Sequence, residues 1–150
     1  HATLVEGAEH LWRCVRYVDM NMVRAGGVKH PEEWEWCGYR ELMGLRERYR
    51  LIDQDHLLEA LGDGVTREGF RRVHMEGIAE ALQKGDLTRE GMWTESLAVG
   101  SQGFVESVKE TLKNRRRAEV TQAQGGTGWI LREPDSNGSL DAVFGHKKSL

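Results

Sequence analysis

The sequence predicts a mainly α-helical protein, a bundle of several short helices that ends in a flexible tail. Three observations support this fold class. Apolar residues recur at spacings of three and four positions in several segments, which is the period of one helix face. Only two prolines, Pro31 and Pro134, interrupt the 150 residues. Few segments alternate apolar and polar residues as half-buried strands do.

The first helix is expected over residues 5–25. Its apolar residues are spaced by four, three and four positions, which places them on one face: Leu11, Val15, Val18 and Met22. Gly26 and Gly27 follow, and glycine is the usual residue where a helix ends.

Shorter helices are expected further along the chain, each introduced by a turn or by a capping residue. Pro31 opens a turn that contains Trp34 and Trp36. Asp53 and Thr66 can each accept a hydrogen bond from the first turn of a helix that follows them. The expected helices cover residues 38–44, 53–61, 66–82 and 101–114.

The chain divides into three expected segments. Residues 1–50 form a tyrosine-bearing helix and a tryptophan-rich turn, and residues 51–120 form a helical domain. Residues 121–150 form a flexible linker and tail, because residues 121–128 are rich in Gly, Gln and Thr.

The composition excludes several classes of protein. With 24 acidic and 21 basic residues the net charge is −3, so bulk positive charge does not hold nucleic acid. No apolar run approaches the roughly 18 residues of a membrane span, so we expect no membrane partner. Cys14 and Cys37 make neither a disulfide framework nor a CxxC zinc site, which indicates a cytoplasmic protein.

Three polar residues of the first helix lie on one face and form the candidate site. Tyr17, Asn21 and Arg24 are spaced by four and three positions. A tyrosine hydroxyl can attack a phosphate if a metal or another cation polarises that phosphate. Asn21 could supply an oxygen ligand to such a metal, and Arg24 could pair with the phosphate. The alternative is a half-buried tyrosine with solvated polar neighbours.

The same stretch resembles a known family of enzymes. Tyr17-Val-Asp-Met-Asn21-Met-Val-Arg24-Ala-Gly26-Gly-Val28, followed by Pro31-Glu-Glu-Trp34-Glu-Trp36-Cys-Gly-Tyr39-Arg40, resembles the REP-associated tyrosine transposases, bacterial relatives of the single-tyrosine HUH transposases. The resemblance is specific over residues 16–40 and looser over about 10–115. It implies that Tyr17 is the catalytic nucleophile on single-stranded DNA near a hairpin, that Asn21 is a metal ligand, and that the complete enzyme holds Mg²⁺ or Mn²⁺.

The departures from the family pattern limit what this chain is expected to do. Met22 stands where the family usually has proline, and Cys37-Gly38 replaces a Ser-Ser pair. The histidine pair spaced His-x-His that holds the metal in the family does not occur among the six histidines. The chain therefore corresponds to the C-terminal portion, without the metal-binding half. We expect no cofactor and no unaided nicking, although Tyr17 could act in trans within a dimer.

Other residues are candidates for contact with DNA. Arg24 and the basic residues after the last helix could bind phosphates: Lys113, Arg115, Arg116 and Arg117. Trp34, Trp36 and Tyr39 could stack on bases or pack the turn against the first helix. Residues 88–114 could form a helix-turn-helix with 101–114 as the recognition helix.

The expected function is therefore that of a transposase-derived DNA-binding protein. Its expected partner is single-stranded or hairpin DNA, and a homodimer is possible. Two alternatives stay open: a non-catalytic helical interaction or dimerisation domain, and a helix-turn-helix protein that binds duplex DNA.

Overall fold

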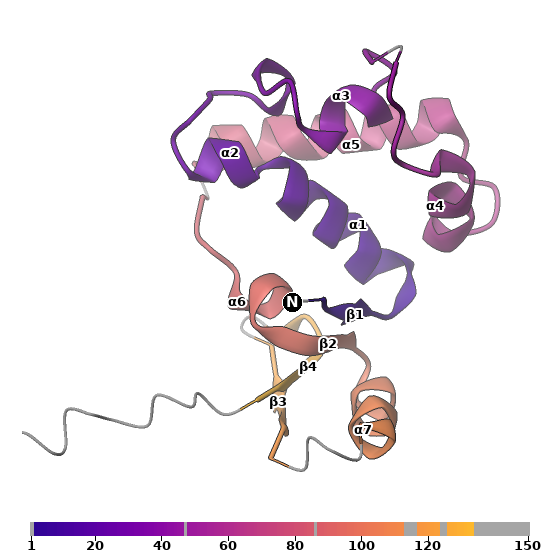
Figure 1. Ribbon diagram of the computed structural model, residues 1–150, viewed down its shortest axis with the longest axis vertical. Helices are drawn as coiled ribbons and strands as arrows, with labels where there is room; N and C mark the ends of the chain where they lie inside the picture. The colour runs from indigo at the N-terminus through magenta and orange to yellow at the C-terminus, as the bar shows by residue number, and fades with distance from the viewer. Residues whose placement is uncertain (1, 47, 86, 113–116, 124–125, 134–150) are drawn as a thin grey trace, which may run out of the picture.

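The computed structural model describes residues 2–46, 48–85, 87–112, 117–123 and 126–133. The chain has a mixed α/β fold, with 53% helix and 12% strand, and a four-stranded sheet lies below a group of helices (Figure 1). The prediction of a mainly α-helical bundle is therefore wrong. The helices were predicted well, and the error lies in the strands.

The helical part comprises the first five α-helices and one short 3-10 helix. The helices expected at 38–44, 53–61 and 66–82 are all present, with shifted ends. The first expected helix is present in two pieces, because α1 ends at Asp19 and a second helix begins at Asn21. The bounds are α1 Gly7–Asp19, α2 Asn21–Arg24, η1 Pro31–Glu33, α3 Gly38–Leu42, α4 Gln54–Leu61 and α5 Arg67–Lys84.

Capping residues predicted from the sequence start two of these helices. The Asp53 carboxylate accepts a hydrogen bond from the His56 N–H at 3.1 Å, and the Thr66 hydroxyl accepts one from the Gly69 N–H at 3.1 Å. Gly85 ends α5 with a φ of 63°, a left-handed conformation that glycine adopts without a steric cost.

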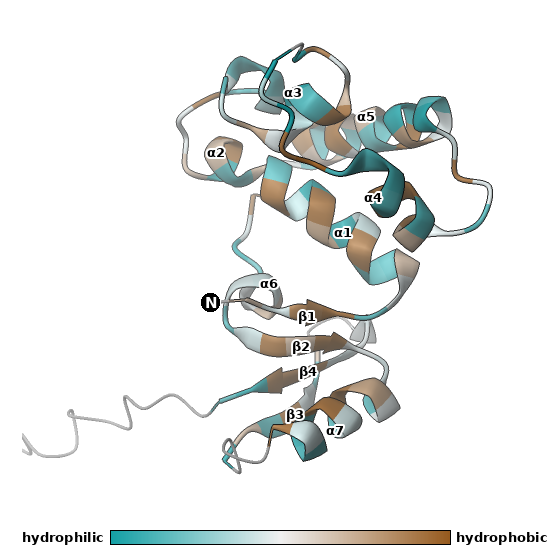
Figure 2. Ribbon diagram, turned by 45° about the vertical axis from the view of Figure 1, so that its right-hand side comes forward, coloured by the Kyte–Doolittle hydropathy of each residue, from teal (hydrophilic) through white to brown (hydrophobic). Residues whose placement is uncertain are grey.

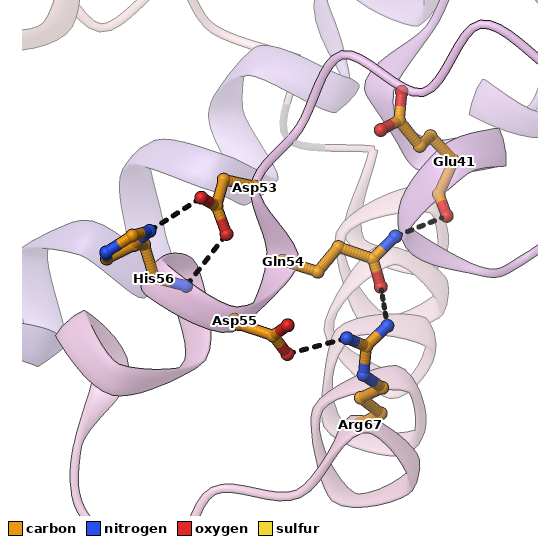
Figure 3. A network of polar contacts seen from close by, with 6 residues as sticks. All are labelled: Glu41, Asp53, Gln54, Asp55, His56 and Arg67. Carbon is orange, nitrogen blue, oxygen red and sulfur yellow. Dashed lines mark hydrogen bonds and ion pairs between the residues drawn. The ribbon is translucent and has the colours of Figure 1, made fainter.

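A polar network holds α4 against the rest of the helical part (Figure 3). The Arg67 guanidinium donates to Asp55 at 2.6 Å and to the Gln54 side chain at 3.3 Å. Gln54 in turn donates to the carbonyl oxygen of Glu41 at 3.0 Å. The buried Glu41 carboxylate accepts from the backbone of the segment before α4, at Leu51 N and Ile52 N.

The sheet part was not expected from the sequence. Its strand order is β1-β2-β4-β3, with β1 parallel to β2 and the other two pairs antiparallel. Two helices belong to this part, α6 before β2 and α7 after it. The bounds are β1 Leu4–Val5, α6 Gly91–Thr94, β2 Ser96–Gly100, α7 Gln102–Thr111, β3 Glu119–Gln122 and β4 Trp129–Arg132.

The strands replace two predicted features. The turn of the expected helix-turn-helix is strand β2, so the two helices of that motif do not form as a pair. Part of the expected flexible linker is the β3–β4 hairpin. All five residues of β2 are buried because both faces of the sheet are covered, so β2 lacks the alternation that identifies a strand in a sequence.

Helices cover the sheet from both sides. On one face, α7 packs its Val105 against Leu97 and Leu131. On the other face, Tyr17 of α1 and Trp93 of α6 pack against Val99 and neighbouring apolar side chains. Figure 2 shows β1, β2 and β4 as largely hydrophobic between these layers.

The helical part has its own core above this layer. Met20, Val23 and Ile78 are buried together, and Trp12 stacks on Phe70 with ring centroids 5.0 Å apart. Helix α1 therefore contributes to two cores, one on each side. None of the helices in the described part of the chain is long and apolar enough to cross a membrane.

Candidate functional site

The three residues that the sequence singled out, Tyr17, Asn21 and Arg24, lie together at the junction of α1 and α2. The Arg24 guanidinium lies over the Tyr17 ring, with its carbon 3.7 Å from the ring centroid. Arg24 Nη2 donates to the carbonyl oxygen of Tyr17 at 2.6 Å and also to the Asn21 side-chain oxygen. The three residues form one contact group in which Arg24 is the central member.

Tyr17 is itself part of the contact between the helical part and the sheet part. Only 7% of its surface is exposed, and its ring lies 6.3 Å from the Trp93 ring. Val99 of β2 and Ile130 of β4 belong to the same cluster. Tyr17 therefore packs in the core that joins the two parts.

A pocket of about 290 Å³ opens beside Tyr17, and we call it the Tyr17 pocket. Its walls are α1 and α2, the C-terminal end of α5, and the segment that follows α5. Its described lining residues include four cations and two carboxylates among uncharged residues: Arg13, Arg16, Tyr17, Met20, Arg24, Gly77, Glu80, Ala81, Lys84, Thr88 and Glu90. The lining therefore carries a net charge of about +2 when each side chain has its usual charge at neutral pH.

The cations of the Tyr17 pocket are only partly neutralised. Lys84 pairs with Glu80 at 2.6 Å, and Arg13 Nη2 pairs with Glu90 at 3.4 Å. Arg13 Nη1 is buried and has no hydrogen-bond partner among the described residues. The Arg13 guanidinium also lies over the Trp93 ring, with its carbon 5.7 Å from the ring centroid.

Arg16 and Arg24 complete the basic lining. A side chain at position 77 would lie 3.2 Å from Arg16 Nη1, so Gly77 provides the room that Arg16 occupies. Burial lowers the pKa of Arg24, and the neighbouring Tyr17 and Glu90 oppose this shift. An arginine keeps its positive charge at neutral pH under such conditions.

The residues around Tyr17 do not fit a divalent metal ion. The Asn21 side-chain oxygen, which the resemblance assigns to the metal, accepts a hydrogen bond from Arg24. A guanidinium at that oxygen repels a second cation. Within the described ranges, no group of three His, Cys, Asp or Glu side chains could hold a metal.

Of the basic residues predicted after the last helix, Arg117 is among the described residues, whereas Lys113, Arg115 and Arg116 lie outside them. Arg117 is exposed, lies two residues before β3 and does not line the Tyr17 pocket. The structure therefore does not bring Arg117 together with Arg24.

A buried polar cluster next to the pocket was not predicted. His74 Nε2 lies 2.8 Å from the Asp19 carboxylate, and both side chains are almost fully buried. The Cys37 thiol also donates to Asp19, at 3.3 Å. Burial, followed by the charge of Asp19, raises the pKa of the Cys37 thiol to about 12, so this thiol is not a nucleophile at neutral pH. The cluster joins α1 to α5 and to the start of α3.

The aromatic residues of the turn have different roles. Tyr39 is buried and packs against the rings of His30 and His74, so the packing alternative holds for Tyr39. Trp36, in contrast, is 73% exposed, and Trp34 is 36% exposed.

Sequence reasoning missed Arg13, Arg16 and Lys84. The sequence contained a signal for the first two. Arg13 lies four positions before Tyr17, and Arg16 lies three positions after Arg13, so helical spacing places both arginines near the side of the helix that carries Tyr17. Lys84 reaches the pocket only through the packing of α5. Neither a family model, nor a curated protein, nor a solved structure matches the chain.

Proposed function

We propose that this chain binds DNA and that the Tyr17 pocket holds its phosphates. One observation carries the proposal: Arg13, Arg16, Arg24 and Lys84 converge around one pocket in a chain whose net charge is −3. Positive charge concentrated in this way attracts a phosphate although the whole chain is acidic.

The chemistry of the lining suits an oxyanion such as a phosphate better than a simple halide. Arginine presents several N–H donors in a planar fork that matches phosphate oxygens, and the pocket has three arginines. Hydrogen bonds to Tyr17 and Asn21 fix the position of Arg24 before any ligand arrives.

The proposed partner is a single strand or a hairpin, in keeping with the resemblance to the REP-associated tyrosine transposases. Tyr17 lies in the lining of the pocket, so a phosphate bound there lies next to the residue that would attack it. The proposal includes no nicking by this chain alone, since the surroundings of Tyr17 do not fit a metal. A metal-binding HUH half would have to complete the site.

The test is fluorescence anisotropy with a hairpin-bearing strand, a scrambled strand and a duplex, each at two salt concentrations. We expect tightest binding to the hairpin strand and weaker binding at higher salt. The double variant Arg16→Gln/Lys84→Gln should bind the hairpin strand at least about tenfold more weakly, because each charged hydrogen bond contributes about 1.5 kcal/mol or more.

The matched control removes two positive charges elsewhere. Arg72→Gln/Lys109→Gln changes two exposed residues that do not line the Tyr17 pocket. This control should bind within about twofold of the unchanged chain. If both double variants lose affinity equally, only net charge matters and the pocket is not the site. Binding to none of the three DNAs, or binding that is indifferent to salt, contradicts the proposal and favours an apolar interaction domain.

A further inference from the structure

His10 connects the first turn of α1 to the turn of the β3–β4 hairpin. Its Nδ1 lies 3.0 Å from the carbonyl oxygen of Glu6, and its Nε2 lies 3.0 Å from the carbonyl oxygen of Thr127. The second contact spans 117 positions of the sequence. The half-buried imidazole therefore ties together two elements that meet only when the chain folds.

The protonation state of the ring decides how many of these two contacts are hydrogen bonds, because a carbonyl oxygen can only accept. A neutral imidazole carries one N–H and donates to one of the two oxygens. Its other nitrogen then turns a lone pair toward the second oxygen at 3.0 Å, which is repulsive. An imidazolium donates from both nitrogens. The observed geometry therefore fits the charged ring.

The hairpin turn leaves room for the ring at Gly128. This residue has a φ of 132°, which favours glycine, and a Cβ atom at its position would lie 2.5 Å from His10 Nε2. A side chain at position 128 would therefore displace the imidazole. The Gly128 carbonyl oxygen accepts from the Ala123 N–H at 2.8 Å and closes the turn. The imidazole thus contacts a turn that backbone hydrogen bonds define.

Glu6 supplies a negative charge that acts on the imidazole from the start of α1. Its carboxylate accepts a hydrogen bond from the Ser101 N–H at 2.6 Å and interacts electrostatically with His10. Of the neighbouring charged residues of α1, Glu9 is exposed, and Arg13 pairs with a carboxylate of the segment that follows α5.

The hairpin and the end of β2 bring no further titratable group to this contact. Residues 120–130 contain no titratable side chain, and neither Gly100 nor Ser101 at the end of β2 can titrate. Glutamate side chains ionise near pH 4, whereas imidazole side chains ionise between about pH 5 and pH 8. A change of the contact in the second range therefore originates at His10.

We propose that His10 is a pH-sensitive latch, which in its imidazolium form holds the β3–β4 turn on α1. Deprotonation removes one of the two hydrogen bonds, so the turn detaches more readily at higher pH. The stabilisation is present at acid pH and is lost as the pH rises through the range in which imidazole deprotonates. The latch residues His10 and Thr127 do not line the Tyr17 pocket, so the latch does not depend on what that pocket binds.

Hydrogen exchange at the hairpin turn tests the latch. The readout is the protection factor of the Ala123 amide, which compares its exchange rate with that of the unfolded chain at the same pH. In the unchanged chain this factor should fall about threefold or more between about pH 5.5 and pH 8, because a charged hydrogen bond at a half-buried site is lost. In His10→Gln, which cannot titrate at this position, most of this fall should disappear.

The matched control removes a histidine that also pairs with an acceptor but lies in the helical part. His56 of α4 is 80% exposed and lies 2.6 Å from the Asp53 carboxylate. His56→Gln should leave the pH dependence of the Ala123 amide as it is in the unchanged chain. If His56→Gln abolishes that dependence as His10→Gln does, the amide reports the stability of the whole chain, and the latch is refuted.

The ring itself is observed by NMR in the unchanged chain, so this measurement does not require any variant to fold. Near pH 5.5 both ring N–H protons of His10 should be visible, because hydrogen bonds to the two carbonyl oxygens slow their exchange with water. Either of two results would overturn the proposal: a His10 ring without two visible N–H protons at that pH, or an equal fall of the Ala123 protection factor in the unchanged chain and in His10→Gln.

Discussion

The Tyr17 pocket and residues 32–51, which we call the tryptophan segment, both combine features of nucleic-acid-binding surfaces, but in different proportions. The tryptophan segment exposes Trp36 by 73% and Tyr49 by 86%. It contains five glutamates and four arginines, so its net charge is −1. The Tyr17 pocket has twice as many cations as carboxylates among its described lining residues. The tryptophan segment therefore exposes aromatic rings but has no excess of positive charge that would attract a nucleic acid.

The arginines of the two regions also differ in what they contact. In the tryptophan segment, Arg40 donates to the carbonyl oxygen of Glu32 at 2.9 Å, and Arg46 donates to the carbonyl oxygen of Glu35. Two of the four arginines of this segment therefore bind backbone carbonyl oxygens. In the Tyr17 pocket, Arg13 pairs with Glu90, and Arg24 donates to the Tyr17 carbonyl oxygen and to Asn21. Arginines of both regions have partners within the chain, so the balance of cations and carboxylates separates the two regions more than these contacts do.

The largest effect on the free energy of unfolding is expected at Asp19, which joins the two regions. Asp19 pairs with His74 of α5, which forms a wall of the Tyr17 pocket, and accepts from Cys37 at the start of α3. Asp19→Ala leaves a buried imidazole unpaired and should lower the free energy of unfolding by about 3–5 kcal/mol. Urea denaturation measures this loss.

The matched control for Asp19 is an exposed carboxylate that also has a partner. Asp55 pairs with Arg67 at 2.6 Å and is 82% exposed. Asp55→Ala should cost less than about 1 kcal/mol, as exposed pairs do. Equal losses for the two variants would show that the buried cluster does not hold the regions together.

A smaller effect on stability is expected at Glu6, where the sheet part meets the start of α1. Hydrogen bonds from Ser101, first from its side chain and then from its backbone N–H, lower the pKa of the Glu6 carboxyl. The folded chain therefore holds this proton less tightly than the unfolded chain. This contribution to stability is present above the ordinary pKa of glutamate and is lost as the pH falls through the lowered value.

Glu6→Gln should remove part of the acid-induced loss of stability, by less than about 1 kcal/mol. Thermal unfolding at neutral pH and near pH 4 measures the difference between the two proteins. A steeper loss of stability in Glu6→Gln at acid pH would contradict the assigned role of Ser101.

The smallest effect is expected at the exposed rings. Trp36→Ala/Tyr49→Ala should change the affinity for the hairpin strand by less than about twofold, because these rings do not line the Tyr17 pocket. A base stacked on one of them would contribute about 1–3 kcal/mol. Fluorescence anisotropy at constant salt measures this change. A loss of fivefold or more would mean that the tryptophan segment binds bases, and that charge alone does not separate the two regions.

The helical part could be predicted because its signals are local. Asp53 and Thr66 cap helices as their side-chain chemistry requires, and Gly85 ends α5. The predicted buried face of the first helix was less accurate, since Val18 is 53% exposed. Helix α1 lies between two cores: Tyr17 packs in the core next to the sheet, whereas Trp12 and Val15 pack in the helical part.

The sheet part and most of the candidate site depend on contacts that are distant in the sequence. Leu4 pairs with Ala98, and the β3–β4 hairpin adds to the other side of β2. Strands of two to five residues are too short to show a period, and β2 is buried on both faces. Lys84 and Glu90 reach the Tyr17 pocket only because α5 and the segment after it return to α1.

The most direct test of the account is the salt dependence of binding by the Tyr17 pocket. The association constant for the hairpin strand is measured over a range of salt concentrations for the unchanged chain and for Arg16→Gln/Lys84→Gln. Loss of two phosphate contacts to a single strand should reduce the slope of log K against log salt concentration by about 1.4. Equal slopes for the two proteins would contradict the account, because the pocket would then hold no phosphate.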